Sequence, residues 1–145
     1  MYKKILVPTD GSPLSAAAIA YGVGLAKSTG ATVVGMTVSV PFHTFALDPM
    51  MVSDTKESYK KDCEAQATKD LGVITAAARA AGVPCDVVHV DAEHPYEGII
   101  DTARRAGCDL IVMASHGRKG ASALVLGSET VKVLTHSKVP VLVCR

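Results

Sequence analysis

The chain has no tryptophan, no asparagine, few aromatic residues and almost no net charge. Its 15 basic and 14 acidic residues among 145 leave a formal charge of +1, which gives no electrostatic attraction for nucleic acid or an anionic membrane. Without asparagine there is no acceptor for N-glycosylation. No apolar run approaches the roughly 20 residues that span a bilayer. We therefore expect a cytosolic protein that binds neither nucleic acid nor a membrane.

The four cysteines are widely spaced and show no metal-binding or redox pattern. Cys63, Cys85, Cys108 and Cys144 form no C-x-x-C pair and have no histidine at the spacing of a zinc site. We predict that they are small, buried or half-buried apolar residues in a reduced intracellular protein. The five histidines form no ligand spacing either, so we expect no metal site built only from protein side chains.

Apolar residues make up 48% of the chain, which is enough for one domain with a substantial core over residues 1–145. Five short apolar runs alternate with four longer stretches that are compatible with helices. The runs are rich in β-branched residues and apolar throughout, which is typical of parallel strands covered on both faces. They are residues 5–7, 32–40, 86–90, 110–114 and 139–144. This alternation predicts an open, doubly wound α/β sheet with right-handed crossovers.

Helix stripes and helix ends fit between these runs. Apolar residues recur at spacings of three or four in two of the longer stretches. The stripes are Leu14, Ala18, Tyr21 and Leu25 in the first, and Tyr59, Cys63, Ala67, Leu71, Ile74, Ala78 and Ala81 in the second. Ser12, which precedes a proline, is the predicted N-cap of one helix, and Pro95 predicts the start of another. Gly30, Gly82 and Gly107 follow helical stretches, where a left-handed C-terminal residue is expected.

One segment is longer than the other connections. Pro41 to Ser53 is at the upper end of ordinary loop lengths, so we predict a mobile flap after the second strand. Its apolar residues would cover a base in the ligand crevice. Alternatively, Phe42, Phe45 and the pair Met50-Met51 pack on the domain or on a partner.

Two connections that carry glycine come directly after strands of this sheet. Ligands of open α/β sheets bind outside the carboxyl ends of the strands, where the strand order reverses. Residues 8–12 follow the first run, and residues 115–128 follow the fourth. The second connection closes on Gly127-Ser128 before a helical stretch, so unpaired backbone N–H groups and the helix dipole would favour an anion there. Phosphate is the expected ligand.

Other phosphate-binding and catalytic motifs do not fit the chain. There is no G-x4-G-K-[ST], which excludes a P-loop ATPase as far as sequence can exclude it. The G-x-G at Gly22-Val23-Gly24 lies within a helix stripe and not after a strand, so we interpret it as a packing contact. No serine elbow or Cys-His pairing indicates a catalytic nucleophile.

Five segments together carry a resemblance to a known family. They are the opening KKILVPTDGS, the strand Val33–Val38, the segment Cys108–Gly117, the pair Gly127-Ser128 and the closing Val139–Val143. In these segments the chain resembles the universal stress protein family over essentially its whole length. The resemblance implies a five-stranded parallel sheet in the order 3-2-1-4-5 with helices on both faces, a Rossmann-like fold of the adenine nucleotide alpha hydrolase type.

Many members of that family bind ATP through the motif G-x2-G-x9-G-[ST]. Here its positions are Ala114, Gly117, Gly127 and Ser128, so alanine replaces the first glycine. If that backbone needs a positive φ or a close approach to ribose, the added methyl group costs about 1 kcal/mol. If the residue only ends the strand, alanine is harmless. The other three positions favour nucleotide binding in the context of a strand, a loop and a helix.

Each of these positions has a ligand-binding and a purely structural interpretation. Gly117 and Gly127 would let the backbone approach phosphate oxygens, and Ser128 would cap the next helix and donate its hydroxyl to phosphate. Alternatively, the glycines only form turns and Ser128 only caps. Asp10 would accept a ribose hydroxyl or contact a phosphate-bound magnesium ion, or it would only close an Asx turn before Ser12.

The resemblance implies a wider nucleotide site around these positions. The backbone of Val38 would contact adenine, and Pro8, Thr9 and Met113 would line the pocket, although all four could also be core residues. The full predicted set is Pro8, Thr9, Asp10, Val38, Met113, Ala114, His116, Gly117, Arg118, Gly127, Ser128 and Glu129.

Two side chains of this set lie inside the predicted loop. Arg118 would neutralise phosphate charge, or it would simply be solvated. His116 would donate to a phosphate or shuttle a proton, or it would serve as a local hydrogen-bond partner. The sequence leaves both alternatives open.

The last strand predicts a partner. In the order taken from the resemblance it lies at a sheet edge, with Val139, Val141 and Val143 on one face and more apolar residues on the other. Such an edge invites pairing with another chain, so we predict a homodimer through this strand, as in relatives of the family. The alternative is that a helix or a terminus of the same chain covers the edge.

Three functions therefore follow, in this order. The first is a stress-response protein that binds ATP with magnesium as a regulatory ligand, acts as a homodimer and is not an enzyme. The second is an interaction dimer of the same family that binds no nucleotide, which the alanine in the motif would favour. The third is a slow ATP hydrolase, for which no residue is a compelling base.

Overall fold

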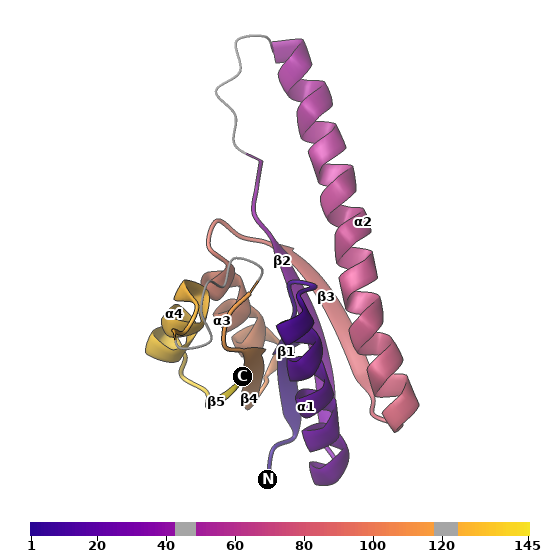
Figure 1. The fold of residues 1–145 in the computed structure, drawn as a ribbon, viewed down its shortest axis with the longest axis vertical. Coiled ribbons are helices and arrows are strands. Elements are labelled where there is room, and N and C mark those ends of the chain that lie inside the picture. The colour runs from indigo at the N-terminus through magenta and orange to yellow at the C-terminus, as the bar shows by residue number, and fades with distance from the viewer. Residues whose placement is uncertain (43–48, 118–124) are drawn as a thin grey trace.

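The computed structural model describes residues 1–42, 49–117 and 125–145, with the backbone alone for residues 49–54. Strands and helices alternate along these residues, as the sequence predicts (Figure 1). They are β1 (Lys4–Pro8), α1 (Pro13–Thr29), β2 (Thr32–Ser39), α2 (Pro49–Ala81), β3 (Cys85–Asp91), α3 (Pro95–Ala106), β4 (Leu110–Ala114), α4 (Ser128–His136) and β5 (Val141–Cys144).

The strands form one parallel sheet in the order β3-β2-β1-β4-β5. The order reverses next to β1, whose Leu6 pairs with Val34 of β2 on one side and with Ile111 of β4 on the other. Both the doubly wound α/β class and the predicted strand order are confirmed. By the general rule for such sheets, the carboxyl ends of β1 and β4 flank the expected ligand position.

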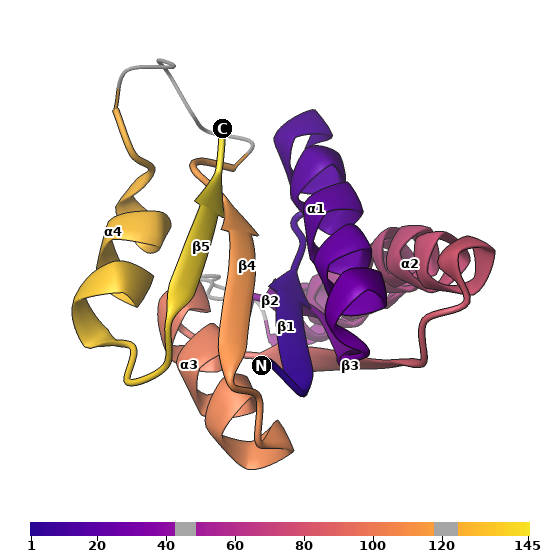
Figure 2. The same ribbon diagram turned by 90° about the horizontal axis from the view of Figure 1, so that it is seen from below.

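Helices cover both faces of the sheet and divide the core in two. In Figure 2, α1 and α2 lie on one side of the strands, and α3 and α4 lie on the other. Alternate residues of each strand point to opposite faces: Ile5 and Val7 pack with α1 and α2, while Leu6 packs with α3 and α4. Continuous apolar runs thus become two separate cores, as the sequence pattern indicates.

Two glycines allow the helices on one face to approach the sheet closely. A Cβ built at Gly22 of α1 would lie 2.7 Å from Val7 Cγ2, and one built at Gly35 of β2 would lie 2.9 Å from two side-chain atoms of Ile74. The predicted packing role of the Gly22-Val23-Gly24 segment is therefore right for Gly22. It is wrong for Gly24, around which a Cβ would meet no atom within 4 Å.

The helix ends predicted at Ser12, Gly30, Gly82 and Gly107 are confirmed. The side chain of Ser12 accepts the backbone N–H of Ser15 at 3.2 Å and caps α1. Gly30, Gly82 and Gly107 have φ values of +72°, +70° and +68°, the left-handed conformation in which a side chain would be strained.

The predicted stripe of α1 is wrong at one position. Tyr21 is 63% exposed, because the buried face of α1 is rotated by about one residue relative to the predicted stripe. The buried residues are Ser15, Ala18, Ile19, Gly22, Val23 and Ala26. Since α1 is rich in alanine and glycine, its sequence distinguishes the faces only weakly.

The flap prediction is partly wrong. Residues 49–53, which we expected in a loop, belong to α2, because Pro49 fits a first helical position and starts the helix upstream of the predicted stripe. Residues 43–48 lie outside the described part of the chain. Figure 1 shows α2 extending beyond the sheet. There the Tyr59 hydroxyl donates to the Val40 carbonyl at 2.7 Å, and its ring lies 5.2 Å from that of Phe42.

The last strand is shorter than predicted. It begins at Val141 and not at Val139, because Ser137 holds Val139 in a turn: the Ser137 hydroxyl donates to the Val139 carbonyl at 2.7 Å. Val139 and Val141 pack against the core under α3 and α4, whereas Leu142 is 42% exposed.

The cysteines behave as predicted. Cys108 and Cys144 are buried, Cys63 and Cys85 are half-buried, and all four are free thiols. Within the described residues, no helix combines the length and the apolar character needed to cross a membrane.

Candidate functional site

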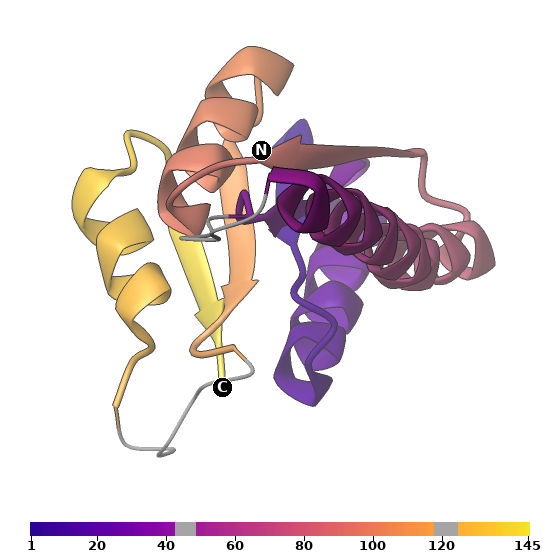
Figure 3. The ribbon, with the colours of Figure 1, turned by 90° about the horizontal axis from the view of Figure 1, so that it is seen from above.

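The two glycine-bearing connections meet at the carboxyl end of the sheet. A Cβ built at Gly117, after β4, would overlap Oδ2 of Asp10, which follows β1. Seen from above, α1 and α4 lie on opposite sides of β4 (Figure 3). The structure therefore brings together two segments that are more than 100 residues apart, and glycine at position 117 is what allows the contact.

The β1–α1 connection is closed by its own polar groups. Oδ1 of Asp10 accepts the N–H of Ser12 at 3.0 Å and the hydroxyl of Ser15 at 2.8 Å. Gly11 has a φ of +77° and donates its N–H to the Thr9 hydroxyl at 3.1 Å. The Asx turn that the sequence offered as one role of Asp10 is therefore present. It uses Oδ1, while Oδ2 lies on the side of Gly117.

Ala114 ends β4 in an ordinary strand conformation. It pairs with Cys144 of β5, and no described non-glycine residue has a positive φ. The backbone conformation here thus does not require the glycine found in the family motif. The neighbouring Cys144 offers no nucleophile, because burial raises the pKa of its thiol.

Gly127 is required by close packing and not by its φ, which is −61°. Its N–H donates to the Ser115 carbonyl at 2.8 Å, and a Cβ built there would lie 3.0 Å from His116 Cα. The Thr130 hydroxyl donates to the Ala114 carbonyl at 3.0 Å. The first turn of α4 is in this way attached to the end of β4.

The prediction that Ser128 caps α4 is wrong. Ser128 is the first helical residue, and Gly127 occupies the N-cap position without any side-chain cap. The bond from Gly127 to the Ser115 carbonyl ends the loop one residue earlier than expected. The first N–H groups of α4 therefore have no side-chain acceptor within the described residues, and these are the groups that bind an anion at a helix N-terminus.

Two other predicted residues have polar partners outside the loop glycines. His116 Nδ1 lies 3.1 Å from the Ser115 hydroxyl, which is the local hydrogen bond that the sequence left as an alternative. Glu129 accepts the N–H of Tyr96 at 2.7 Å and lies 3.5 Å from Lys132 Nζ. Glu129 therefore contacts α3. Arg118 lies outside the described residues.

The predicted adenine-contacting residues lie on the α3 and α4 side of the sheet. Met113 is buried in the core of that side, and Val38 packs against it. α3 comes close to Val38 because a Cβ built at Gly98 would lie 3.1 Å from Val38 Cγ2. Pro8 and Thr9, at the end of β1, are both buried.

Sequence analysis missed a polar cluster at the ends of β2 and β3. The Ser39 hydroxyl lies 2.7 Å from His89 Nε2, and Asp91 Oδ1 lies 4.0 Å from that same nitrogen. In a catalytic triad the serine and the carboxylate contact different ring nitrogens of the histidine, so this cluster does not activate a nucleophile. No sequence motif links these residues; the parallel pairing of β2 with β3 brings them together.

The described residues include no group of three or more histidine, cysteine, aspartate or glutamate side chains placed to hold a metal ion. Magnesium usually takes one or two carboxylates together with substrate phosphates. Asp10 is a single carboxylate beside the β4–α4 connection, an arrangement that suits this mode of binding better than a site built from protein ligands alone.

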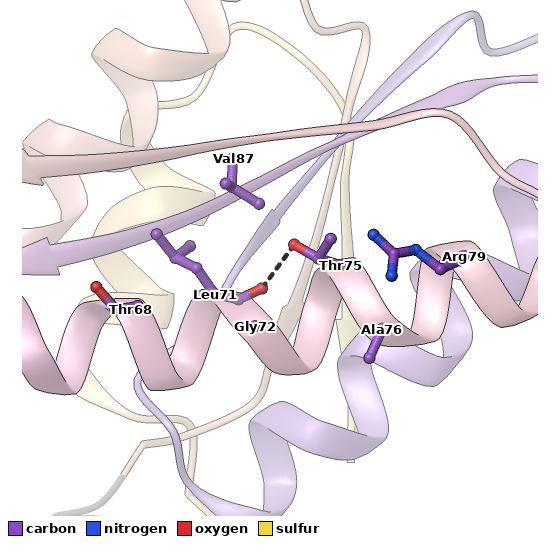
Figure 4. Close-up of a pocket in the computed structure, with 7 residues that line it drawn as sticks. All are labelled: Thr68, Leu71, Gly72, Thr75, Ala76, Arg79 and Val87. Atoms are coloured by element: carbon purple, nitrogen blue, oxygen red, sulfur yellow. Dashed lines mark hydrogen bonds between the residues drawn. The ribbon is translucent and has the colours of Figure 1, made fainter.

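A separate groove lies between α2 and β3, away from this site. It has a volume of about 390 Å³. Figure 4 shows that one face of α2 forms most of its wall, with Val87 of β3 opposite. Its lining residues are Thr68, Leu71, Gly72, Thr75, Ala76, Arg79 and Val87. None of them belongs to the predicted nucleotide site.

Comparison with known proteins gives a consistent result along the whole chain. The model of the universal stress protein family matches residues 1–145. The universal stress protein YxiE of Bacillus subtilis is 30% identical, and the match covers 100% of both proteins. The solved structure of MJ0577, a universal stress protein of Methanocaldococcus jannaschii, is 28% identical with a TM-score of 0.83, covering 99% of this chain and 96% of that one.

Two more distant structures share the fold and contain nucleotides. A universal stress protein in complex with cAMP is 22% identical with a TM-score of 0.71, covering 99% of this chain and 97% of the other. The universal stress protein of Archaeoglobus fulgidus in complex with dAMP is 18% identical with a TM-score of 0.70, covering 99% and 98%.

Proposed function

This chain belongs to the universal stress protein family, and from that premise we propose that it binds ATP with magnesium as a regulatory ligand. Complexes of more distant family members with cAMP and dAMP support an adenine nucleotide as the class of ligand. The observation that carries the proposal is the N-terminus of α4, which has no side-chain cap among the described residues and lies after the contact between Asp10 and Gly117. Unpaired N–H groups at a helix N-terminus are suited to phosphate.

The proposed ligand crosses the carboxyl end of the sheet. Its phosphates contact the backbone at Gly117 and Gly127 and the hydroxyl of Ser128, with Arg118 and His116 as further donors. Oδ2 of Asp10 accepts a ribose hydroxyl or contacts the magnesium ion held by the phosphates.

The base binds on the other side of β1. Val38 contacts adenine through its backbone, while Pro8, Thr9 and Met113 line the pocket. Ala114 borders the ribose, and its ordinary strand backbone supports a site that tolerates alanine there.

In this proposal ATP is a ligand and not a substrate. In the described part of the β4–α4 loop, His116 Nδ1 contacts the hydroxyl of its neighbour Ser115, and the histidine of the Ser39 cluster lies at the ends of β2 and β3. Neither histidine contacts a described carboxylate through its other ring nitrogen, as the base of a catalytic triad does. Occupancy of the site by ATP orders the segments around the carboxyl end of the sheet and so changes the surface that a protein partner meets. Such a change is how a nucleotide regulates a stress-response protein without being consumed.

Calorimetric titration with ATP and magnesium tests the proposal, after mass spectrometry has shown that no nucleotide came through purification. We expect saturable binding in the wild type and none in Gly127→Val, whose side chain would press on His116. Gly24→Val is the matched control, since a Cβ at that exposed helical position meets no atom. No binding in the folded wild type would favour the interaction dimer, and phosphate release above that of Gly127→Val would show hydrolysis.

We also propose that the chain forms a homodimer through β5. This strand is at the edge of the sheet, and Leu142 on it is exposed together with Val131 and Leu134 of α4. Light scattering should give twice the mass of one chain for the wild type and the mass of one chain for Leu142→Lys. Leu142 is the suitable position, because Val139 and Val141 also serve the core. The alternative, a dimer that binds no nucleotide, would give the same masses in light scattering but would show no binding in the ATP titration.

A further inference from the structure

Glu129 makes a hydrogen bond that its own helix does not explain. Its Oε2 accepts the backbone N–H of Tyr96 at 2.7 Å. Tyr96 is in the first turn of α3 and Glu129 is in the first turn of α4, so the bond joins the N-termini of two helices. Without this partner, a carboxylate in the first turn of α4 would be attracted to the same positive end of the dipole that an anionic ligand uses.

The N-terminus of α3 lacks a cap of its own. His94, at the N-cap position, makes no side-chain cap hydrogen bond, and Pro95 has no N–H. The side chain of an N-cap residue usually accepts the N–H that Tyr96 carries. Glu129 supplies that acceptor from 33 residues further along the chain, and its charge is favourable at the dipole of α3.

The side chain of Tyr96 extends the contact along α4. Its ring lies 5.5 Å from that of His136, with an interplanar angle of 30°, and Lys132 Nζ lies 5.4 Å from the ring centre. Lys132 also reaches Glu129, at 3.5 Å. Because positions 129, 132 and 136 recur at spacings of three and four, they share one face of α4. Tyr96 of α3 therefore packs against that face of α4.

The opposite side of the same turn is attached to β4. The N–H of Gly127 donates to the Ser115 carbonyl, and the Thr130 hydroxyl donates to the Ala114 carbonyl. Bonds to β4 and to α3 thus hold the first turn of α4 from two directions. The N–H groups between these bonds are the ones that we have proposed for phosphate.

From this arrangement we infer that Glu129 is a positioning residue, which fixes the first turn of α4 through Tyr96 and directs its own charge away from the phosphate-binding N–H groups. The inference rests on the proposed function, and it changes the role that family resemblance gave to Glu129 from a ligand contact to a support of the loop. A loop that binds phosphate through its backbone has few side chains to hold its geometry, and the bond to α3 fulfils that need.

Two substitutions of Glu129 test the inference. We expect Glu129→Ala to bind ATP about tenfold more weakly and to exchange the amide protons of Tyr96 and Gly127 faster in NMR experiments. Glu129→Gln keeps a carbonyl acceptor for the Tyr96 N–H, so its ATP affinity and its amide exchange rates should be close to those of the wild type. Glu64→Ala, which removes one exposed carboxylate from α2, should match the wild type.

The outcomes separate the inference from the proposed function. Unchanged ATP affinity in Glu129→Ala, with faster exchange at Tyr96, would overturn the positioning role. If the wild type binds no ATP, the proposed function is wrong. The exchange rates of the Tyr96 and Gly127 amides would still show whether Glu129 positions the first turn of α4. If the Gly127 amide exchanges faster in Glu129→Ala and at the wild-type rate in Glu129→Gln, this would support the inference that Glu129 fixes the first turn of α4. Unchanged exchange at Gly127 in Glu129→Ala would refute it.

Discussion

The first turns of α1 and α4 both follow the carboxyl ends of strands, yet their first backbone N–H groups have different hydrogen-bond partners. In α1 the Ser12 side chain caps the helix, and Asp10 accepts both the Ser12 N–H and the Ser15 hydroxyl. In α4 the N-cap is Gly127, which has no side chain to offer. Within the part of the chain that the structure describes, the start of α1 thus has a side-chain cap and the start of α4 has none.

This difference supports the proposal that the first turn of α4, and not that of α1, binds the phosphates. Both are helix N-termini after parallel strands, so position and dipole alone do not distinguish them. An anion at α1 would have to displace existing hydrogen bonds, whereas at α4 it would make new ones. Because Gly117 contacts Asp10, which closes the turn before α1, a ligand at the N-terminus of α4 would lie beside the capped turn.

Among the variants that test this comparison, Gly117→Ala should cause the largest loss of ATP affinity. The new methyl group would overlap the Asp10 carboxylate, which cannot move away easily because two hydrogen bonds hold its other oxygen. We expect the displaced carboxylate or loop backbone to weaken ATP binding roughly thirtyfold, which corresponds to about 2 kcal/mol of binding free energy, in addition to any loss of stability from overpacking. Titration calorimetry measures the affinity.

Gly24→Ala is the control for that experiment, since it adds the same methyl group in open space within a helix. It should bind ATP as the wild type does and gain up to about 1 kcal/mol in stability. Equal affinity of Gly117→Ala and the wild type would mean that the two turns do not form one site.

A smaller effect is expected for Asp10→Asn, which separates the two roles of this side chain. The amide oxygen of asparagine can still accept the Ser12 N–H and the Ser15 hydroxyl, so the turn before α1 should be kept. The lost charge should weaken ATP binding about tenfold in the presence of magnesium and less without it. Calorimetry with and without magnesium measures this difference.

Asp62→Asn serves as the charge-matched control, because Asp62 is exposed on α2. If Asp10→Asn unfolds more easily but binds ATP normally, then Asp10 only closes the turn. That result would mean that the turn at Asp10 before α1 is not part of the ligand site.

Most of the fold could be predicted from the sequence because its signals are local and repeated. Continuous β-branched runs indicated buried parallel strands, and Gly30, Gly82 and Gly107 marked helix ends through a conformation that strongly favours glycine. α1 was harder: small residues on most of its surface hide the buried face, so Tyr21 was assigned to the wrong side. The start of α2 was missed because its first turns lie beyond the stripe that faces the sheet.

The site could be predicted as a position, but its details depend on contacts between distant residues. Spacing identified Gly117 and Gly127, yet the cap at Gly127 depends on a bond to Ser115, which no local pattern reveals. The partner of Glu129 lies 33 residues earlier. Local patterns therefore locate the loop, while tertiary hydrogen bonds decide which of its groups are free.

The smallest expected effects come from a matched pair, Ser12→Ala and Ser128→Ala, which tests the comparison directly. Ser12→Ala removes the cap of α1 and should cost about 1 kcal/mol in the free energy of unfolding. Ser128→Ala removes no cap, so its stability should stay within about 0.5 kcal/mol of the wild type, while its ATP affinity should fall about fivefold if the hydroxyl donates to phosphate. Urea unfolding and calorimetry on both variants give the four values. Equal losses of stability would show that both helices are capped by serine in solution, and the distinction between a satisfied and an open helix start would then be lost.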